Sequence, residues 1–294
     1  MARIDPTTIV DRRAELADDV EVGPFCHIHA GVRIAEGTRL VSHVVVQGRT
    51  KIGPRCTLHP FVALGGEAQV RKGGEGGLRD LRERHGALDI GADNVFRESV
   101  TVNVSSGAGT TRIGSHNLFM AGCHVAHDAV LGSHCVIANA VQLAGHVVLE
   151  DWVTFGGLAG VAQLLRVGES AFVAAGAMCE RDVPPFSIVQ GDRARVRALN
   201  VVGLERRGVP VASIAALRKA FRALWGTRAG GFDELHVTGM AVESRRRFAI
   251  HFRGTIADDI AAVSGPLAAR LVRRVRDAHG TALGPVASPA FWTR

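Results

Sequence analysis

A histidine followed directly by an aspartate is the pair of residues in this chain best suited to catalysis. His127 and Asp128 lie in the run CHVAHDAVLG. An imidazole changes charge near neutral pH and therefore suits a general base, while a neighbouring carboxylate can fix its tautomer and stabilise its charged form. The chain has 13 His, so the pair gains meaning only from its structural setting. The alternative is a structural role in a turn or wall.

The setting is a repeat of six residues, each unit carrying one large apolar residue. The repeat runs through positions 4–64, returns at 90–102 and continues through 113–173. No helix has this period. It predicts short strands joined by tight turns, with three strands to one triangular coil and the repeated residue pointing inward. The fold class predicted for this part is an all-β parallel β-helix.

One coil of such a prism has about eighteen residues, so residues eighteen apart stack on one wall about 4.8 Å from each other. The column His127, Gly145 and Gln163 follows, and Asp128 stacks beside His146. The catalytic candidate therefore has a carboxylate next to it and a second imidazole one coil away.

A zinc site formed by His124, His127 and His146 is a competing interpretation. Adjacent residues of a strand face opposite sides, and positions 124 and 127 differ by an odd number, so the two converge only if a turn intervenes. We therefore expect no metal. The five cysteines contain no CxxC pair and predict neither a disulfide framework nor a structural zinc site.

The composition limits the partners. A net charge of +7 and a pI near 9.9 favour acidic partners, including a nucleotide substrate or an acidic carrier protein. Aromatic residues make up only 5% and no nucleic-acid module is recognisable, so we expect no nucleic-acid binding. The N-terminal residues lack an apolar signal core, and no apolar run approaches the ~20 residues of a membrane span. These features predict a cytoplasmic protein without stable membrane insertion.

Two interruptions of the repeat, at 65–89 and 103–112, are expected to be loops that leave the coils. We expect the first, which is charged and rich in glycine, to serve an active site. Beyond the run DVPPFSIVQGD the period becomes helical. The domains predicted are a β-helix over 1–182 and a linker with a smaller α-helical domain over 183–294.

Several segments resemble the bacterial UDP-N-acetylglucosamine O-acyltransferases of lipid A biosynthesis, which are hexapeptide-repeat acyltransferases. The matching runs are SHVVVQGRTKIG, FRESVTVN, HNLFMAGCHVAHD, LAGHVVLED, DVPPFSIVQGD and NVVGLERRG. The resemblance covers about residues 1–226. It implies a left-handed β-helix, a homotrimer with active sites between subunits, and transfer of a 3-hydroxyacyl group from acyl carrier protein to the 3-position of UDP-N-acetylglucosamine. It implies no permanently bound cofactor.

The matching motifs also imply roles for single residues. His127 would be the general base, Asp128 its orienting partner, and the amide of Gly145 the donor to the thioester oxyanion. The residues that the resemblance assigns to the sugar nucleotide are Lys72, His124, His146, Gln163, Asn200, Arg206 and Arg207. Those that we assign to the acyl-chain groove are Phe172 and Ala175.

Three positions depart from the family pattern. Ala162 stands where a histidine usually precedes Gln163, Val70 replaces an acidic residue, and Val202 stands where the family often has glutamate. These changes affect the acceptor site more than the general base. The alternatives that follow are an acyl- or acetyltransferase acting on a different or modified sugar nucleotide, including one that uses coenzyme A, and a non-catalytic trimeric paralogue.

Overall fold

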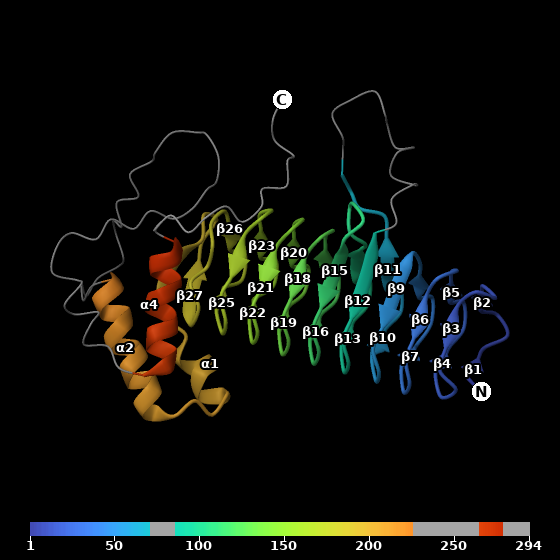
Figure 1. Cartoon of the computed structure of the whole chain (residues 1–294), viewed down its shortest axis with the longest axis horizontal. Coiled ribbons are helices and arrows are strands. Elements are labelled where there is room, and N and C mark those ends of the chain that lie inside the picture. The colour runs from blue at the N-terminus through green and yellow to red at the C-terminus, as the bar shows by residue number, and fades with distance from the viewer. Residues whose placement is uncertain (71–85, 226–264, 279–294) are drawn as a thin grey trace, which may run out of the picture. The chain divides into compact units, whose positions relative to one another are not determined.

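Three parallel sheets form the walls of a triangular β-helix in the computed structural model, which describes residues 1–70, 86–225 and 265–278 (Figure 1). Each coil contributes one short strand to each sheet. Strands in neighbouring coils pair in register, as Thr57 with Val95 and Leu58 with Phe96 illustrate. The repeat of six residues is therefore one strand and one turn, as predicted.

The strands are assigned to the sheets as follows. Sheet 1 contains β1 (Arg3–Ile4), β4 (Glu21–Val22), β7 (Arg39–Leu40), β10 (Thr57–Leu58), β13 (Val95–Phe96), β16 (Leu118–Phe119), β19 (Val136–Ile137), β22 (Thr154–Phe155), β25 (Phe172–Val173), β27 (Ser187–Gln190) and β28 (Arg195–Leu199). Sheet 2 contains β2 (Ile9–Val10), β5 (His27–Ile28), β8 (Val45–Val46), β11 (Ala63–Gly66), β14 (Thr101–Asn103), β17 (His124–Val125), β20 (Gln142–Leu143), β23 (Gly160–Val161) and β26 (Met178–Cys179). Sheet 3 contains β3 (Glu15–Leu16), β6 (Arg33–Ile34), β9 (Arg49–Ile52), β12 (Ala87–Ile90), β15 (Thr110–Ile113), β18 (Val130–Leu131), β21 (Val148–Leu149) and β24 (Arg166–Val167).

The repeated apolar residue fills the interior of the prism. Leu58, Phe96 and Phe119 are fully buried, and the rings of the two phenylalanines stack with centroids 4.8 Å apart. Burial of such a side chain contributes about 1.5–3 kcal/mol. Ile4 is exposed because the first coil has a neighbouring coil on one side only. The five cysteines are free and buried, which agrees with a packing role.

From Phe25 onward, most turns of the prism are built around a residue with left-handed backbone. At the corner between sheets 2 and 3, Asp128, His146 and Leu164 have φ of 59°, 60° and 65°. At the corner between sheets 3 and 1, Trp152 and Ser170 have φ of 63° and 54°. This regularity keeps the eighteen-residue stacking over many coils, which is what places side chains at a fixed corner.

The two interruptions leave the prism between strands. The first lies between β11 and β12, and its central residues 71–85, including Lys72, fall outside the described residues. The second is shorter than its sequence suggests, because β14 continues to Asn103 and β15 begins at Thr110. Both strands pair within their sheets, so only the residues between them leave the prism.

The C-terminal part of the chain forms two separate pieces. β27 adds to sheet 1 in parallel with β25, β28 returns antiparallel, and α1 (Val201–Arg206) completes a compact unit that ends at Arg207. The second unit contains α2 (Val211–Trp225) and α4 (Pro266–Ala278), which pack against each other. The apolar residues that share one face of α2 are buried, namely Ile214, Leu217, Phe221 and Leu224. None of the described helices has the length and hydrophobicity that a membrane span requires.

Candidate active site

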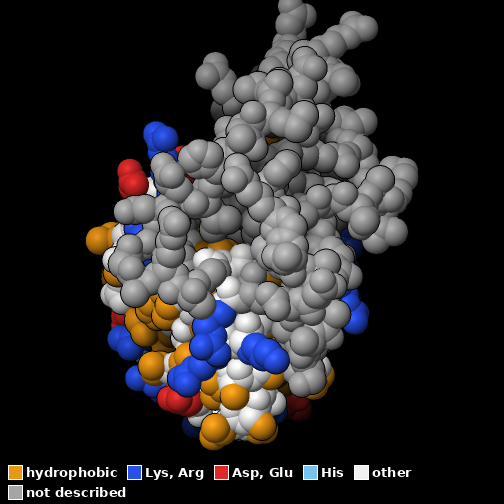
Figure 2. Space-filling view, turned by 90° about the vertical axis from the view of Figure 1, so that its left-hand side faces the viewer, with side chains coloured by type: hydrophobic (Ala, Val, Ile, Leu, Met, Phe, Trp, Pro, Cys, Tyr) orange, Lys and Arg blue, Asp and Glu red, His pale blue; other side chains and the backbone are white. Residues whose placement is uncertain are grey.

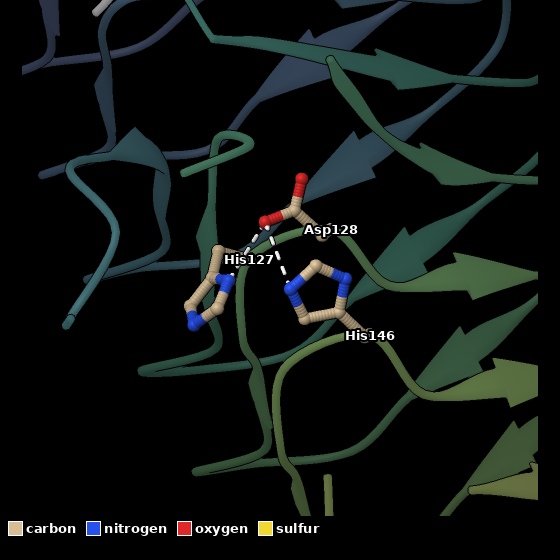
Figure 3. A group of neighbouring side chains, drawn as sticks. All are labelled: His127, Asp128 and His146. Carbon is tan, nitrogen blue, oxygen red and sulfur yellow. Dashed lines mark hydrogen bonds and ion pairs between the residues drawn. The ribbon is translucent and has the colours of Figure 1, made fainter. Parts of the chain in front are cut away.

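His127 and Asp128 form a hydrogen-bonded dyad at the corner between sheets 2 and 3, directly after β17. Nδ1 of His127 lies 2.8 Å from Oδ2 of Asp128, and both side chains are largely buried (Figure 3). An ionised carboxylate can only accept, so the hydrogen of the neutral imidazole resides on Nδ1. Nε2 then carries the free lone pair, which is the state that a general base requires.

The second interruption of the repeat holds Asp128. Ser105 Oγ donates to Oδ1, while the backbone N–H and the hydroxyl of Ser106 donate to Oδ2 at 3.0 and 2.6 Å. Asp128 N–H donates to Thr111 Oγ1 at 2.8 Å. Burial acts to raise the pKa of Asp128, but the hydrogen bonds from His127, Ser105 and Ser106 outweigh it and hold the pKa well below its ordinary value. Asp128 therefore stays ionised at neutral pH.

Gly145 lies one coil after His127 and packs against its ring. A Cβ atom at Gly145 would lie 2.6 Å from Cε1 and 2.7 Å from Nε2 of His127, so only glycine permits this contact. Within the described part of the chain, the N–H of Gly145 has no hydrogen-bond acceptor. A potential oxyanion donor and the free nitrogen of a potential base therefore lie on adjacent coils.

Three further predicted residues surround the dyad. His146 Nε2 lies 3.6 Å from Asp128 Oδ2, and its ring meets that of His127 edge to face at 5.4 Å. His124 Nδ1 lies 2.8 Å from the hydroxyl of Thr101. Burial, and secondarily the proximity of His127, lowers the pKa of His124, so its imidazole is neutral at pH 7. Gln163 is exposed in the next coil, beside Leu164, whose N–H donates to the carbonyl of Gly145.

Other predicted residues lie at different corners of the same chain. Asn200 and Arg207 contact Ser170 at the corner between sheets 3 and 1, and Arg206 ends α1 beside them. Phe172 lies in β25 of sheet 1, and Ala175 is exposed in the turn that follows. A single chain therefore does not bring these residues to His127.

The structure also shows where the three positions that depart from the family pattern lie. Val70 lies within the first interruption, as the last residue described before its central part, and Ala162 follows β23 with its side chain half-buried against the core. Val202 is exposed on α1. Of these, Ala162 lies nearest in sequence to the column of His127, Gly145 and Gln163.

The possible metal ligands that the structure brings together differ from the three histidines that the sequence suggested. Among the described residues, the ligand atoms that come within 4.8 Å of one another belong to His127, Asp128 and His146, and His124 is not among them. Both carboxylate oxygens of Asp128 already accept hydrogen bonds from Ser105, Ser106 and His127. This chemistry fits an acid–base dyad better than a cation site.

Ser105, Ser106 and Thr111 were not predicted as site residues. The eighteen-residue rule fails there because the second interruption lengthens the coil, so that Ser105 lies 23 residues before its partner Asp128. A signal was available in the sequence: two adjacent serines stand in a loop that immediately precedes the coil of the dyad.

Comparisons with known proteins agree on one family. Residues 182–239 match a family model described as UDP-N-acetylglucosamine O-acyltransferase, domain 2, and residues 110–145 match the six-repeat bacterial transferase hexapeptide model. A relative named acyl-[acyl-carrier-protein]–UDP-N-acetylglucosamine O-acyltransferase from Rhizobium johnstonii is 39% identical over 76% of this chain and 80% of its own. A relative of the same name from Stenotrophomonas maltophilia is 43% identical over 76% of this chain and 83% of its own.

Solved structures lead to the same family. LpxA from Acinetobacter baumannii is 34% identical, with a TM-score of 0.69 over 77% of this chain and 86% of that one. UDP-N-acetylglucosamine O-acyltransferase from Moraxella catarrhalis is 29% identical, with a TM-score of 0.73 over 93% of this chain and 96% of that one. These matches and the three parallel sheets confirm the predicted left-handed parallel β-helix with a small helical part. The chain belongs to the family of acyl-[acyl-carrier-protein]–UDP-N-acetylglucosamine O-acyltransferases.

Proposed function

We propose that this protein transfers a 3-hydroxyacyl group from acyl carrier protein to the 3-hydroxyl of UDP-N-acetylglucosamine, the first step of lipid A biosynthesis. The names of its relatives support the reaction class and both substrates. The observation that carries the proposal is the contact between His127 and Gly145, which combines a base nitrogen with a backbone N–H on the next coil.

The dyad performs the transfer by moving one proton twice. Nε2 of His127 takes the proton of the 3-hydroxyl while its oxygen attacks the thioester carbonyl carbon. The negative charge on the carbonyl oxygen is stabilised by the N–H of Gly145, and Asp128 stabilises the imidazolium. When the tetrahedral intermediate collapses, the C–S bond breaks and the departing thiolate takes the proton from Nε2. The enzyme returns to its starting protonation state.

A homotrimer would complete the acceptor site. Asn200, Arg206 and Arg207 are at the corner between sheets 3 and 1, whereas the dyad is at the corner between sheets 2 and 3. In a trimer of parallel prisms, α1 of one subunit can approach the dyad of its neighbour. His124, His146 and Gln163 would then contact the sugar from the subunit that supplies the base.

The C-terminal unit is the proposed docking surface for the acidic acyl carrier protein. Arg218, Lys219 and Arg222 are exposed on α2, and Arg270, Arg273 and Arg274 are exposed on α4. Figure 2 shows Lys and Arg side chains among apolar ones on the face that it presents. Positive charge at this surface would speed the encounter with an acidic partner. A cytoplasmic location remains a prediction.

One assay separates the proposal from its alternatives. The purified protein is incubated with UDP-N-acetylglucosamine and a panel of 3-hydroxyacyl carrier protein thioesters, with acetyl-coenzyme A in parallel, and products are identified by mass. We expect a 3-O-acylated sugar nucleotide formed only from carrier protein thioesters. A product from acetyl-coenzyme A alone would identify an acetyltransferase. The absence of any product, while the trimer stays intact, would identify a non-catalytic paralogue.

A further inference from the structure

One buried amide close to the dyad lacks a hydrogen-bond partner. Asn103, the last residue of β14, is only 6% exposed. Among the residues that the structure describes, its Oδ1 is the one buried side-chain nitrogen or oxygen without such a partner. Buried polar side-chain atoms are nearly always paired in folded proteins, because their removal from water is otherwise costly. The bare oxygen therefore indicates a ligand that supplies an N–H or O–H donor.

Asn103 follows the wall that supports the site histidines. Residues two apart along a strand share a face, and two positions before Asn103 the hydroxyl of Thr101 lies 2.8 Å from His124 Nδ1. Two positions after Asn103, the hydroxyl of Ser105 donates to Asp128. Asn103 therefore lies between a residue that contacts a site histidine and a residue that contacts the dyad.

The neighbouring coils leave one side of His127 for the acceptor sugar. Gly145, the proposed oxyanion donor, lies in the coil after His127, whereas Asn103 lies in the coil before it. The thioester carbonyl belongs at the N–H of Gly145, and Phe172 and Ala175, assigned to the acyl chain, lie in later coils still. The sugar then presents its 3-hydroxyl to Nε2 from the opposite side, which is the side of Asn103.

Gly66 leaves room beside this amide. It pairs with Asn103 across neighbouring coils, and a Cβ atom at Gly66 would lie 3.3 Å from Asn103 Nδ2 and 3.6 Å from Gln47 Nε2. Two carboxamides from the coils on either side thus approach the space over a glycine. Carboxamides donate and accept hydrogen bonds but carry no charge. This chemistry suits the hydroxyl and acetamido groups of a sugar better than a phosphate or a metal ion.

We propose that Asn103, Gly66 and Gln47 form a subsite for the acceptor sugar, in which Asn103 Oδ1 accepts a hydrogen bond from a donor next to the reacting 3-hydroxyl. Two groups of N-acetylglucosamine have this position, namely the N–H of the 2-acetamido group and the 4-hydroxyl. The contact orients the ring so that the 3-hydroxyl faces His127 Nε2. This inference rests on the proposed function and adds three residues that the resemblance does not assign.

The test compares the affinities of the full-length protein for UDP and for UDP-N-acetylglucosamine, both measured by calorimetry. Asn103→Leu keeps the approximate shape of the side chain and removes its polar atoms. It should weaken binding of UDP-N-acetylglucosamine about 3–10-fold, as the loss of one neutral hydrogen bond does. Its affinity for UDP should equal that of the parent, because UDP carries no acceptor sugar. Its melting temperature should not fall, because Oδ1 has no hydrogen bond to lose among the described residues.

Asn94→Leu is the matched control. Asn94 is also buried, but its Nδ2 donates to the carbonyls of Gly91 and Gly114 at 2.9 Å, and its Oδ1 accepts from Asn117 N–H at 2.9 Å. This variant should lower the melting temperature, because it breaks these hydrogen bonds. The ratio of its affinities for UDP and UDP-N-acetylglucosamine should stay that of the parent.

Gly66→Ala tests the subsite without removing the amide. Its methyl group would occupy the space beside Asn103 and Gln47, so it should weaken binding of UDP-N-acetylglucosamine and leave binding of UDP unchanged. Two analogues identify the donor: UDP-2-deoxyglucose lacks the acetamido group, and 4-deoxy-UDP-N-acetylglucosamine lacks the 4-hydroxyl. The analogue that lacks the donor should bind equally to the parent and to Asn103→Leu.

Three results would overturn the inference. The first is an Asn103→Leu protein that binds UDP-N-acetylglucosamine as tightly as the parent. The second is an equal loss of affinity for UDP and for UDP-N-acetylglucosamine, which would mean that Asn103 only maintains the structure. The third is a loss that persists with both analogues. If Asn103→Leu does not fold, Gly66→Ala decides by the same comparison. A parent that binds UDP-N-acetylglucosamine but transfers no acyl group contradicts the proposed function alone.

Discussion

The ring of His127 packs directly on the backbone of Gly145, so closely that a Cβ atom there would lie 2.7 Å from Nε2. Asp128 Oδ2 lies 2.8 Å from the other ring nitrogen, Nδ1. Nε2, which faces Gly145, is therefore not engaged by Asp128. The geometry therefore couples the position of the base to the absence of a side chain one coil away.

Gly145→Ala should greatly reduce acyl transfer while the protein stays folded. The new methyl group would displace the His127 ring, and a misplaced base loses much of the 10²–10⁴-fold acceleration typical of general base catalysis. The measurement is kcat together with the melting temperature. Gly157→Ala is the matched control, because a Cβ there would meet only the carbonyl of Asn139 at an ordinary 3.4 Å. Full activity in Gly145→Ala would contradict the inference that a side chain at position 145 displaces the ring of His127.

Asp128→Asn should reduce kcat less than loss of His127 does. The amide keeps the shape of the carboxylate but removes the charge that stabilises the imidazolium and fixes its tautomer. Steady-state rates of Asp128→Asn and His127→Ala are compared under the same conditions. Equal losses would mean that the two residues act as one unit.

The same variant should change the dependence of stability on acid. The pKa of Asp128 is lower in the folded protein than its ordinary value, so below that value the unfolded chain binds more protons. This contribution to the free energy of unfolding is present above about pH 4 and is lost as the pH falls toward the folded pKa. Urea unfolding at several pH values should show a shallower acid decline for Asp128→Asn than for the parent. If the free energy of unfolding fell equally steeply with acid in both proteins, the result would contradict this contribution of Asp128 to stability.

How far the sequence predicted this site depends on the regularity of the coils. The eighteen-residue repeat predicted that Gly145 lies beside His127 and that Asp128 lies beside His146, which the structure confirms. The support of Asp128 by Ser105 and Ser106 was not predictable from the repeat, because an interruption changes the spacing.

The contacts of Arg207 could not be predicted from the sequence either. Its partners Ser170 and Glu169 are 37 and 38 residues away and Trp152 is farther still, and they meet it only because α1 returns to the last coils. Such packing of a helix on a prism has no periodic signature, whereas the core of the prism does.

Ala162→His should strengthen binding of UDP-N-acetylglucosamine by about 1 kcal/mol, one hydrogen bond's worth. The half-buried side chain of Ala162 directly precedes Gln163, at the position where the resemblance leads us to expect a histidine. Calorimetric affinity of the variant is compared with that of the parent and of Ala140→His, a control in a turn at another corner. Unchanged or weaker binding would indicate an acceptor site adapted to a different sugar nucleotide.

Ala175→Gly should shift the preferred acyl chain upward in length. Ala175 is exposed in the turn after β25, near Phe172, and a methyl group in an apolar groove excludes part of a longer chain. Each methylene that cannot be buried forfeits about 0.8 kcal/mol. Competition among carrier protein thioesters of graded length measures the preference. If the parent already prefers the longest acyl chains and Ala175→Gly does not change that preference, Ala175 does not limit the chain length.

The most direct measurement of the central claim is the rate of acyl transfer from 3-hydroxyacyl carrier protein to UDP-N-acetylglucosamine by the parent and by His127→Ala. We expect the parent to form the 3-O-acyl product and the variant, still folded, to be slower by about 10²–10⁴-fold because it lacks the base. His43→Ala, at another corner, is the control and should be as active as the parent. A folded His127→Ala protein that keeps most of the parent's turnover would contradict the assignment of His127 as the base.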